Sequence, residues 1–265
     1  MIKKILPLLI SANSAAASCL DRSVSELLPI DKNALYKVNQ VIVSAPKRSY
    51  LYSFPDSMCK MNGVFLIKGD IARSYMTARG FHFINYYDKT GDLHVGWIDS
   101  NAVSAIKKSI PDAPSLTSRD FSIWHNGNLL TVDNKISNVY DKVSAENYAD
   151  SSMFDKFRNI NGVDYKIFVH ESNGLYIEST NINYLALKRD FDDYRMSTIQ
   201  LTSHNGTSAR GIFVGVPVKF VYYVYGKPSK IDGNKIYYEK ELYSLSFEID
   251  KNKAIKNVSV DIIPQ

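Results

Sequence analysis

From residue 40 onward, apolar and polar residues alternate along the chain with a period of two. Val41 and Val43 fall on one face of the first alternating segment, and Tyr50 and Tyr52 fall on one face of the second. Three further segments follow at residues 64–68, 81–87 and 94–98, with turn residues between them. A period of two is typical of half-buried strands. Five short strands at this spacing predict a small β-barrel over residues 40–108, because closure removes the exposed edges of so small a sheet.

The pattern changes after this module. Residues 109–117 contain two prolines and few core-forming side chains, which predicts a linker. Beyond it the chain repeats itself weakly: Leu130, Val132, Ile136, Val139 and Tyr140 have the same spacing as Ile212, Val214, Val218, Val221 and Tyr222. Each copy passes from a strand-like pair into a helix-like stripe and then into strands. We therefore predict a duplicated helix-plus-antiparallel-sheet domain over residues 118–265, and a fold that is mostly β with an α+β second domain.

Two segments of this second domain have clearer helical signals. In the second copy, Pro217 suits the first turn of a helix, Gly226 suits its end, and Pro228 lies just beyond. Between the copies, apolar residues recur at helical spacing at Tyr184, Leu187, Phe191 and Tyr194. This second segment predicts an amphipathic helix with a charged, solvated face.

The N-terminus has the pattern of a secretory leader. Lys3 and Lys4 form a positive region, residues 5–10 form a short apolar run, and three alanines precede Ser18. The pattern predicts a signal peptide at residues 1–17, a tether at residues 18–39 and export to the periplasm. The apolar run is far shorter than the roughly 20 residues that span a bilayer. No downstream stretch approaches that length, so no transmembrane segment is expected.

The chain contains two cysteines, Cys19 and Cys59. In an oxidising compartment such a pair is naturally interpreted as one disulfide, which would attach the tether to the N-terminal module. An alternative is that Ala16-Ala17-Ser18-Cys19 is a lipobox, in which case Cys19 is acylated and anchors a lipoprotein while Cys59 stays free. A lipobox usually has an aliphatic residue where Ala16 stands.

The module from residue 40 to 108 resembles a bacterial SH3-like domain. The resemblance covers about 65 residues and rests on the Lys68-Gly69-Asp70 turn and, most specifically, on the terminal Gly96-Trp97-Ile98. It implies a small barrel with a ligand groove. The possible binding surface is formed by aromatic residues: Tyr50, Tyr52, Phe81, Tyr86 and Trp97. Many members have Gly-Trp in the fourth strand where this chain has Gly80-Phe81.

The second copy of the C-terminal repeat also carries a resemblance. Residues 211–215, Tyr225-Gly226-Lys227-Pro228 and the later strands resemble the helix-then-sheet units of β-lactamase inhibitory proteins. The same segments are similar to units of small outer-membrane assembly lipoproteins. The resemblance covers roughly 55 residues and concerns the fold, so it says little about the ligand.

Composition and charge exclude some classes of function. Charged residues make up 22% of the chain, aromatic residues 12%, and there are 18 tyrosines, which is a folded rather than a disordered composition. The formal net charge is +5, and Lys3 and Lys4 in the leader account for two of those charges. This charge is too small to predict nucleic-acid binding, which demands a concentrated basic face.

No motif in the chain predicts catalysis. None of the five histidines has the spacing of a metal site, and there is no Gly-x-Ser-x-Gly elbow or phosphate-binding loop. No cofactor, metal or catalytic residue is predicted, and a hydrolase remains only an alternative of another class. The leading hypothesis is a non-enzymatic exported protein of the bacterial envelope that neutralises a protein partner, as an immunity protein does. The alternatives are a peptidoglycan-binding module and an outer-membrane assembly scaffold.

Overall fold

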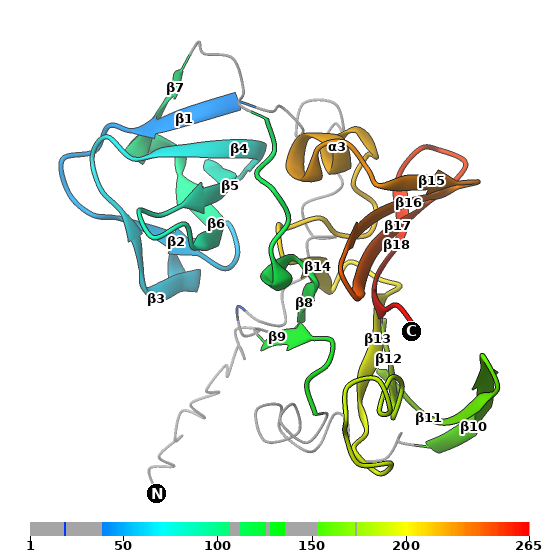
Figure 1. The fold of residues 1–265 in the computed structure, drawn as a ribbon. Helices are drawn as coiled ribbons and strands as arrows, with labels where there is room; N and C mark the ends of the chain where they lie inside the picture. The colour runs from blue at the N-terminus through cyan, green and yellow to red at the C-terminus, as the bar shows by residue number, and fades with distance from the viewer. Residues whose placement is uncertain are drawn as a thin grey trace, which may run out of the picture.

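The computed structural model describes residue 19 and residues 39–106, 112–125, 128–135, 153–172 and 174–264. These residues form three antiparallel sheets and one α-helix, so the fold is mostly β, as the alternating pattern predicts (Figure 1). The predicted signal peptide at residues 1–17, most of the tether, and the helical stripe expected at residues 136–140 lie outside the described residues.

The N-terminal sheet has seven strands in the order β3-β2-β6-β5-β4-β1-β7. Its strands are β1 (Asn39–Val43), β2 (Ser49–Tyr52), β3 (Lys60–Leu66), β4 (Ile71–Ala78), β5 (Phe81–Tyr87), β6 (Leu93–Asp99) and β7 (Val103–Ile106). The short 3₁₀ turns η2 (Ser57–Cys59) and η3 (Ser100–Ala102) connect some of them. The hydrogen bonding of this sheet is not closed into the expected barrel, because β7 pairs with β1 and β3 pairs with β2, which leaves β3 and β7 as edges.

The eight-stranded sheet holds most of the second half of the chain. It consists of β10 (Met153–Ile160), β11 (Val163–Ser172), β12 (Leu175–Thr180), β13 (Arg195–Leu201), β15 (Lys230–Asp232), β16 (Lys235–Lys240), β17 (Tyr243–Ile249) and β18 (Ile255–Ile262). Their order is β10-β11-β12-β13-β18-β17-β16-β15. The sheet therefore consists of two four-stranded meanders, β10 to β13 and β15 to β18. They meet at their last strands, β13 and β18, so the strand numbers rise toward the middle of the sheet from both edges.

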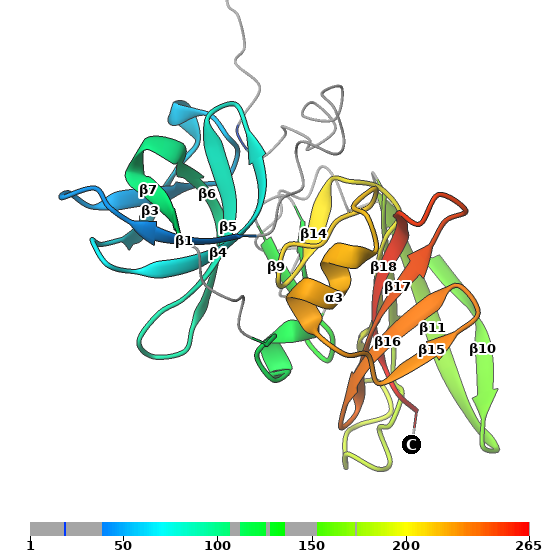
Figure 2. The same ribbon diagram turned by 90° about the horizontal axis from the view of Figure 1, so that it is seen from above.

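A helix and a small sheet lie between the two large sheets (Figures 1 and 2). The small sheet has the order β14-β8-β9, from β8 (Ser122–His125), β9 (Asn128–Thr131) and β14 (Gly206–Ser208), and the 3₁₀ turn η4 (Ser118–Asp120) precedes it. Helix α3 (Lys219–Tyr225) ends at Gly226, whose φ of 78° is a conformation that glycine adopts without strain. The predicted end of this helix is therefore confirmed. Its start is not, because Pro217 lies before the N-cap Val218 and forms an isolated β-bridge with Ala254.

The helix predicted over residues 184–194 is wrong, because this segment forms consecutive turns. Asn183 and Lys188 have φ values of 60° and 53°, and such left-handed residues interrupt an α-helix. Arg189 instead makes a two-pronged ion pair with Asp133 near the end of β9. The helical spacing of the apolar residues here reflects rings such as Tyr184 and Phe191 packing edge to face within a loop.

Two hydrophobic cores hold the molecule together. The smaller lies inside the N-terminal sheet and is formed by Val41, Val43, Leu51, Leu66, Ala72, Ile84 and Ile98. The larger contains buried residues of the eight-stranded sheet, the small sheet and α3, and it also includes Phe54, Tyr75, Met76 and Trp97 from the N-terminal module. The two halves of the chain therefore share one core rather than being connected only by a linker.

Candidate functional site

Three of the five aromatic residues predicted as a binding surface lie where the N-terminal module meets the rest of the chain. Trp97 is only 2% exposed and belongs to the larger core, so it cannot contribute to a surface. Tyr52 and Phe81 are partly buried against that same core, and their ring centroids are 5.2 Å apart. The face of the module that carries these rings is covered by the C-terminal half.

The other two aromatic residues lie apart from this group. Tyr86 is partly buried against the smaller core and stacks on His94, and burial, followed by the charge of Asp70, raises the pKa of its hydroxyl. Tyr50 lies on the outer face of β2, where its ring meets Phe65 at a centroid distance of 6.0 Å. The structure therefore does not bring the five residues together into one groove.

The two cysteines form the predicted disulfide, Cys19–Cys59. It attaches Cys19 to η2 of the N-terminal module, and Cys59 itself is buried in the larger core. A lipid anchor on Cys19 would require the same sulfur atom, so the structure corresponds to the disulfide rather than to the acylated alternative. No helix among the described residues is long and apolar enough to cross a membrane.

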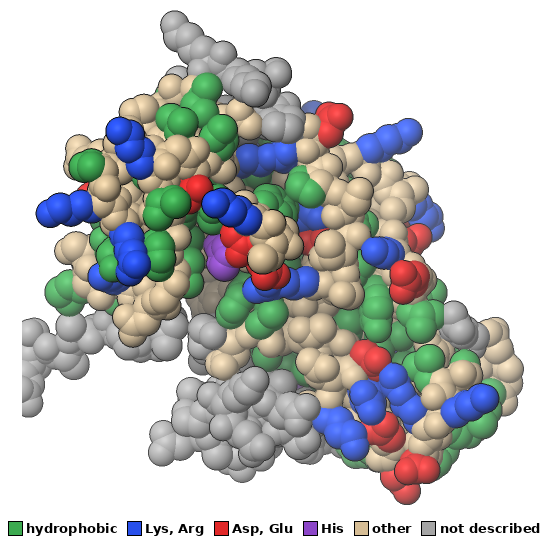
Figure 3. All heavy atoms as spheres, turned by 60° about the vertical axis from the view of Figure 1, so that its left-hand side comes forward, with side chains coloured by type: hydrophobic (Ala, Val, Ile, Leu, Met, Phe, Trp, Pro, Cys, Tyr) green, Lys and Arg blue, Asp and Glu red, His purple; other side chains and the backbone are tan. Residues whose placement is uncertain are grey.

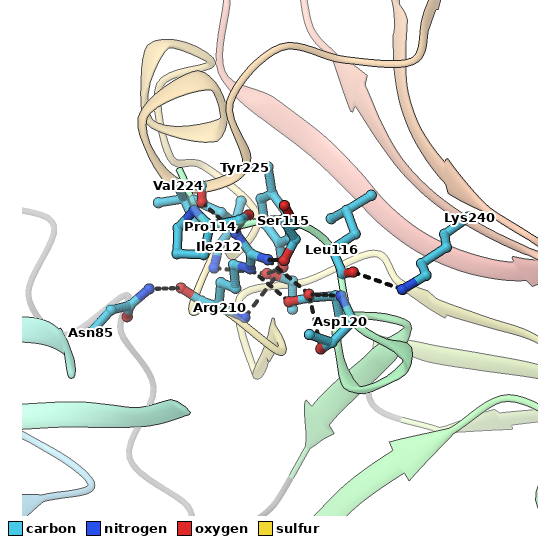
Figure 4. A network of polar contacts seen from close by, with 12 residues as sticks. Asn85, Pro114, Ser115, Leu116, Asp120, Arg210, Ile212, Val224, Tyr225 and Lys240 are labelled. Atoms are coloured by element: carbon cyan, nitrogen blue, oxygen red, sulfur yellow. Dashed lines mark hydrogen bonds and ion pairs between the residues drawn. The ribbon is translucent and has the colours of Figure 1, made fainter. Parts of the chain in front are cut away.

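A buried arginine organises the junction between the two halves (Figure 4). All five N–H groups of the Arg210 guanidinium are used. Two bond the carboxylate of Asp120 at 2.6 and 2.8 Å, and the others bond the carbonyls of Pro114, Ser115 and Val224 at 3.0 to 3.1 Å. The linker, η4 and α3 are therefore attached to one side chain.

The same arginine reaches the N-terminal module through its backbone. Its carbonyl accepts a hydrogen bond of 3.0 Å from Asn85 Nδ2 on β5. Burial alone would lower the pKa of Arg210, but the hydrogen bonds and charge of Asp120 raise it. Because both side chains of this ion pair are at most 4% exposed, the network is a structural junction rather than a site that a ligand could enter.

The histidines do not form a recognisable catalytic group. His170 Nε2 lies 3.2 Å from Ser179 Oγ, but both residues are buried. Burial lowers the pKa of His125 to about 4. Among the described residues, no three His, Cys, Asp or Glu side chains cluster as a metal site would require.

The most ordered polar surface lies on the eight-stranded sheet. Directly paired residues of adjacent strands point to the same face. On one face the pairing produces two apolar rows, Leu175-Leu201-Val258-Phe247-Ile236 and Ile177-Ile199-Val260-Leu245-Tyr238. Every one of these side chains is at most 3% exposed. This face packs on α3 and the small sheet and builds the larger core.

The opposite face carries two polar rows that cross the same five strands, β12, β13, β18, β17 and β16. The acidic row is Glu178-Thr198-Asp261-Ser244-Glu239, and the tyrosine row is Tyr176-Gln200-Ser259-Ser246-Tyr237. We call these ten residues the polar face. Its side chains differ in exposure: Glu239 is exposed and most of the others are partly exposed, whereas Glu178, Ser244 and Ser246 are only 6–8% exposed.

Hydrogen bonds fix two of the three carboxylates of the acidic row. Asp261 accepts bonds of 2.8 Å from the hydroxyls of Thr198 and Ser259, and Glu178 accepts one of 2.7 Å from Tyr176. Burial raises the pKa of Asp261, and the charge of Glu178 raises it further. Arg158 on β10 contacts Glu178 at 3.2 Å. The rows themselves contain three acids and no basic residue, and one of the three carboxylates is paired with Arg158.

Sequence reasoning missed the polar face, although its signal is visible in the chain. Tyr243-Ser-Leu-Ser-Phe-Glu248 and Asn257-Val-Ser-Val-Asp-Ile262 place hydroxyl and acid groups at alternate positions. The alternation identifies strands, but only the register between strands shows that the groups of five segments align in rows.

Comparisons with known proteins add nothing to this picture: no family model matches the chain, and no curated protein or solved structure matches it significantly.

Proposed function

We propose that this chain is a non-enzymatic exported binding protein of the bacterial cell envelope that neutralises a protein partner, as an immunity protein does. The observation that carries the proposal is the polar face: a wide sheet surface with ordered polar rows on one side and a continuous apolar core on the other. The leader-like N-terminus and the Cys19–Cys59 disulfide support a periplasmic location.

The polar face has the properties of a protein-docking surface. Tyr176 and Tyr237 stand at the two ends of their row, four strand spacings or roughly 19 Å apart. Tyrosine is enriched among the residues that dominate binding energy. Between the tyrosines lie Gln200, Ser259 and Ser246, and the two serines are short side chains that lose less entropy on binding than long ones do. Such a surface binds a partner without having to reorganise first.

The strand order supports the proposal that the second domain is a duplicated unit. Because the two four-stranded meanders meet at β13 and β18 with opposite orders, each is consistent with one copy of the proposed helix-and-sheet repeat. We infer that residues 118–265 are a duplicated unit similar to those of β-lactamase inhibitory proteins. We also infer that residues 40–108 are an SH3-like module that supports this unit.

The proposal is tested by co-purification of the exported protein with a secreted effector encoded beside it, and by the survival of cells that produce that effector. Wild-type protein is expected to bind and protect. Replacing Tyr176 and Tyr237 by Ala is expected to weaken binding about tenfold or more. Alanines at Tyr222 and Tyr223, which are 40% and 46% exposed on α3, form the matched control. Absence of protection by the exported protein contradicts the function, and protection by the Tyr176/Tyr237 variant equal to wild type contradicts the site.

A further inference from the structure

A second surface, on the N-terminal module, has the opposite charge. On the outer face of β2 and β3, the guanidinium of Arg48 lies 4.4 Å from the ring centroid of Phe65, and the ammonium of Lys60 lies 3.3 Å from that of Tyr50. The two rings contact each other, so the four side chains form a row in the order Arg48, Phe65, Tyr50, Lys60. The other face of the same strands carries Leu51 and Leu66, both fully buried, whereas the rings of Tyr50 and Phe65 are partly exposed.

The two cations are exposed, and no carboxylate of the described part of the chain pairs with either. Lys47 and Lys68 are exposed beside them, and they too make no ion pair with a described residue. The nearby carboxylate of Asp70 instead accepts a backbone hydrogen bond from Ile67. The rings hold the Arg48 and Lys60 head groups in place, which makes them ready to meet an anionic partner.

Exposed apolar residues flank this row in the sequence. Met58, two residues before Lys60, is 69% exposed, and Ile67, two residues after Phe65, is 48% exposed. Figure 3 shows blue Lys and Arg side chains among green hydrophobic ones over this module. We define the cationic strip by its members: Arg48, Tyr50, Met58, Lys60, Phe65 and Ile67.

We propose that the cationic strip docks the protein on an anionic lipid bilayer. Lysine and arginine are attracted to negatively charged head groups, and aromatic rings favour the membrane interface. Met58 and Ile67 provide the argument for a bilayer rather than a soluble polyanion, because exposed apolar tips gain free energy only where they can leave water. The strip and the polar face are built on different sheets, so membrane docking leaves the polar face available to a protein partner.

The test is co-sedimentation of the purified protein with vesicles of phosphatidylcholine, with and without phosphatidylglycerol. Wild-type protein is expected to bind only the anionic vesicles. The Arg48→Gln/Lys60→Gln variant is expected to bind about 30-fold more weakly. Lys227→Gln/Lys251→Gln removes the same charge from exposed sites on the other half of the chain and is expected to bind like wild type. Thermal unfolding of each variant checks that all remain folded.

A second variant separates a bilayer from other anions. Met58→Ser/Ile67→Ser keeps every charge, and it is expected to lose vesicle binding while retaining binding to dextran sulfate. Any of four results would overturn the proposal. Wild-type protein could bind neutral vesicles equally well or bind no vesicles at all, or full vesicle binding could remain in the Arg48/Lys60 variant or in the Met58/Ile67 variant. None of these results bears on the polar face, because its partner is detected in a separate assay.

Discussion

Replacing Asp120 by Asn is expected to destabilise the protein strongly. The substitution keeps the size of the side chain but leaves the guanidinium of Arg210 charged, 2% exposed and without its counter-ion. Breaking a buried pair in this way costs about 3–5 kcal/mol, because the remaining charge is neither solvated nor compensated. The carbonyls of Pro114, Ser115 and Val224 still accept hydrogen bonds, but they carry no net charge. For a protein of this size, the loss corresponds to a fall in Tm of roughly 6–20 °C.

Urea titration followed by tryptophan fluorescence measures the free energy of unfolding, and Glu248→Gln is the matched control. Glu248 pairs with Lys256 at the surface, where such pairs contribute less than about 1 kcal/mol. The double replacement Asp120→Leu/Arg210→Met is expected to be more stable than Asp120→Asn, because it removes both charges together. If Asp120→Asn is no more destabilising than Glu248→Gln, the argument that this buried ion pair stabilises the fold is refuted.

Three further predictions concern a glycine of the backbone, a buried histidine and the disulfide. Gly211→Ala is expected to destabilise by about 1–3 kcal/mol more than Gly215→Ala. Both glycines have positive φ, but only at Gly211 would a Cβ lie 2.8 Å from the ring of Phe83, and chemical denaturation measures the difference. Burial lowers the pKa of His125 to about 4, so as pH falls this histidine is protonated in the unfolded chain before it is protonated in the folded protein. The free energy of unfolding is therefore expected to fall by about 3 kcal/mol between about pH 6.5 and pH 4. If urea titrations give the same free energy of unfolding across that pH range, the expectation is contradicted. Replacing His125 by Gln should make the free energy of unfolding depend less on pH. Reducing the bond between Cys19 and Cys59, which are 40 residues apart, is expected to cost about 4 kcal/mol, and intact mass with and without reductant confirms the bond by a two-proton difference.

Local patterns in the sequence predicted the strands better than their assembly. Alternation between buried and exposed residues located β1, β5, β6 and, in the second domain, β11, β12, β16, β17 and β18, and Gly226 located the end of α3. It did not locate β4, β10 or β13. A period of two specifies which side of a strand is buried, but it does not specify which strand is its neighbour. The closed barrel was therefore an inference about pairing that the order β3-β2-β6-β5-β4-β1-β7 does not follow.

The candidate site was harder to predict than the fold, because aromatic residues serve both cores and surfaces. Trp97, the most specific residue of the SH3-like resemblance, is buried because β6 faces the C-terminal half of the chain. Nothing local to residues 96–98 reveals that neighbour. The loop at residues 184–194 shows the same limit, since its helical spacing arises from rings that pack against one another across turns with left-handed residues.

The buried junction explains how one chain can present two surfaces of opposite charge. The acidic row and the cationic strip would attract each other if the two halves moved freely, and each would then screen the other from its partner. Arg210 prevents this by bonding the linker, η4 and α3 through its side chain and β5 through its carbonyl. The aromatic face of the N-terminal module is buried in the same contact, around Phe83, Trp97 and Gly211. The aromatic face that the sequence predicted as a ligand groove instead fixes the orientation of the strip relative to the polar face.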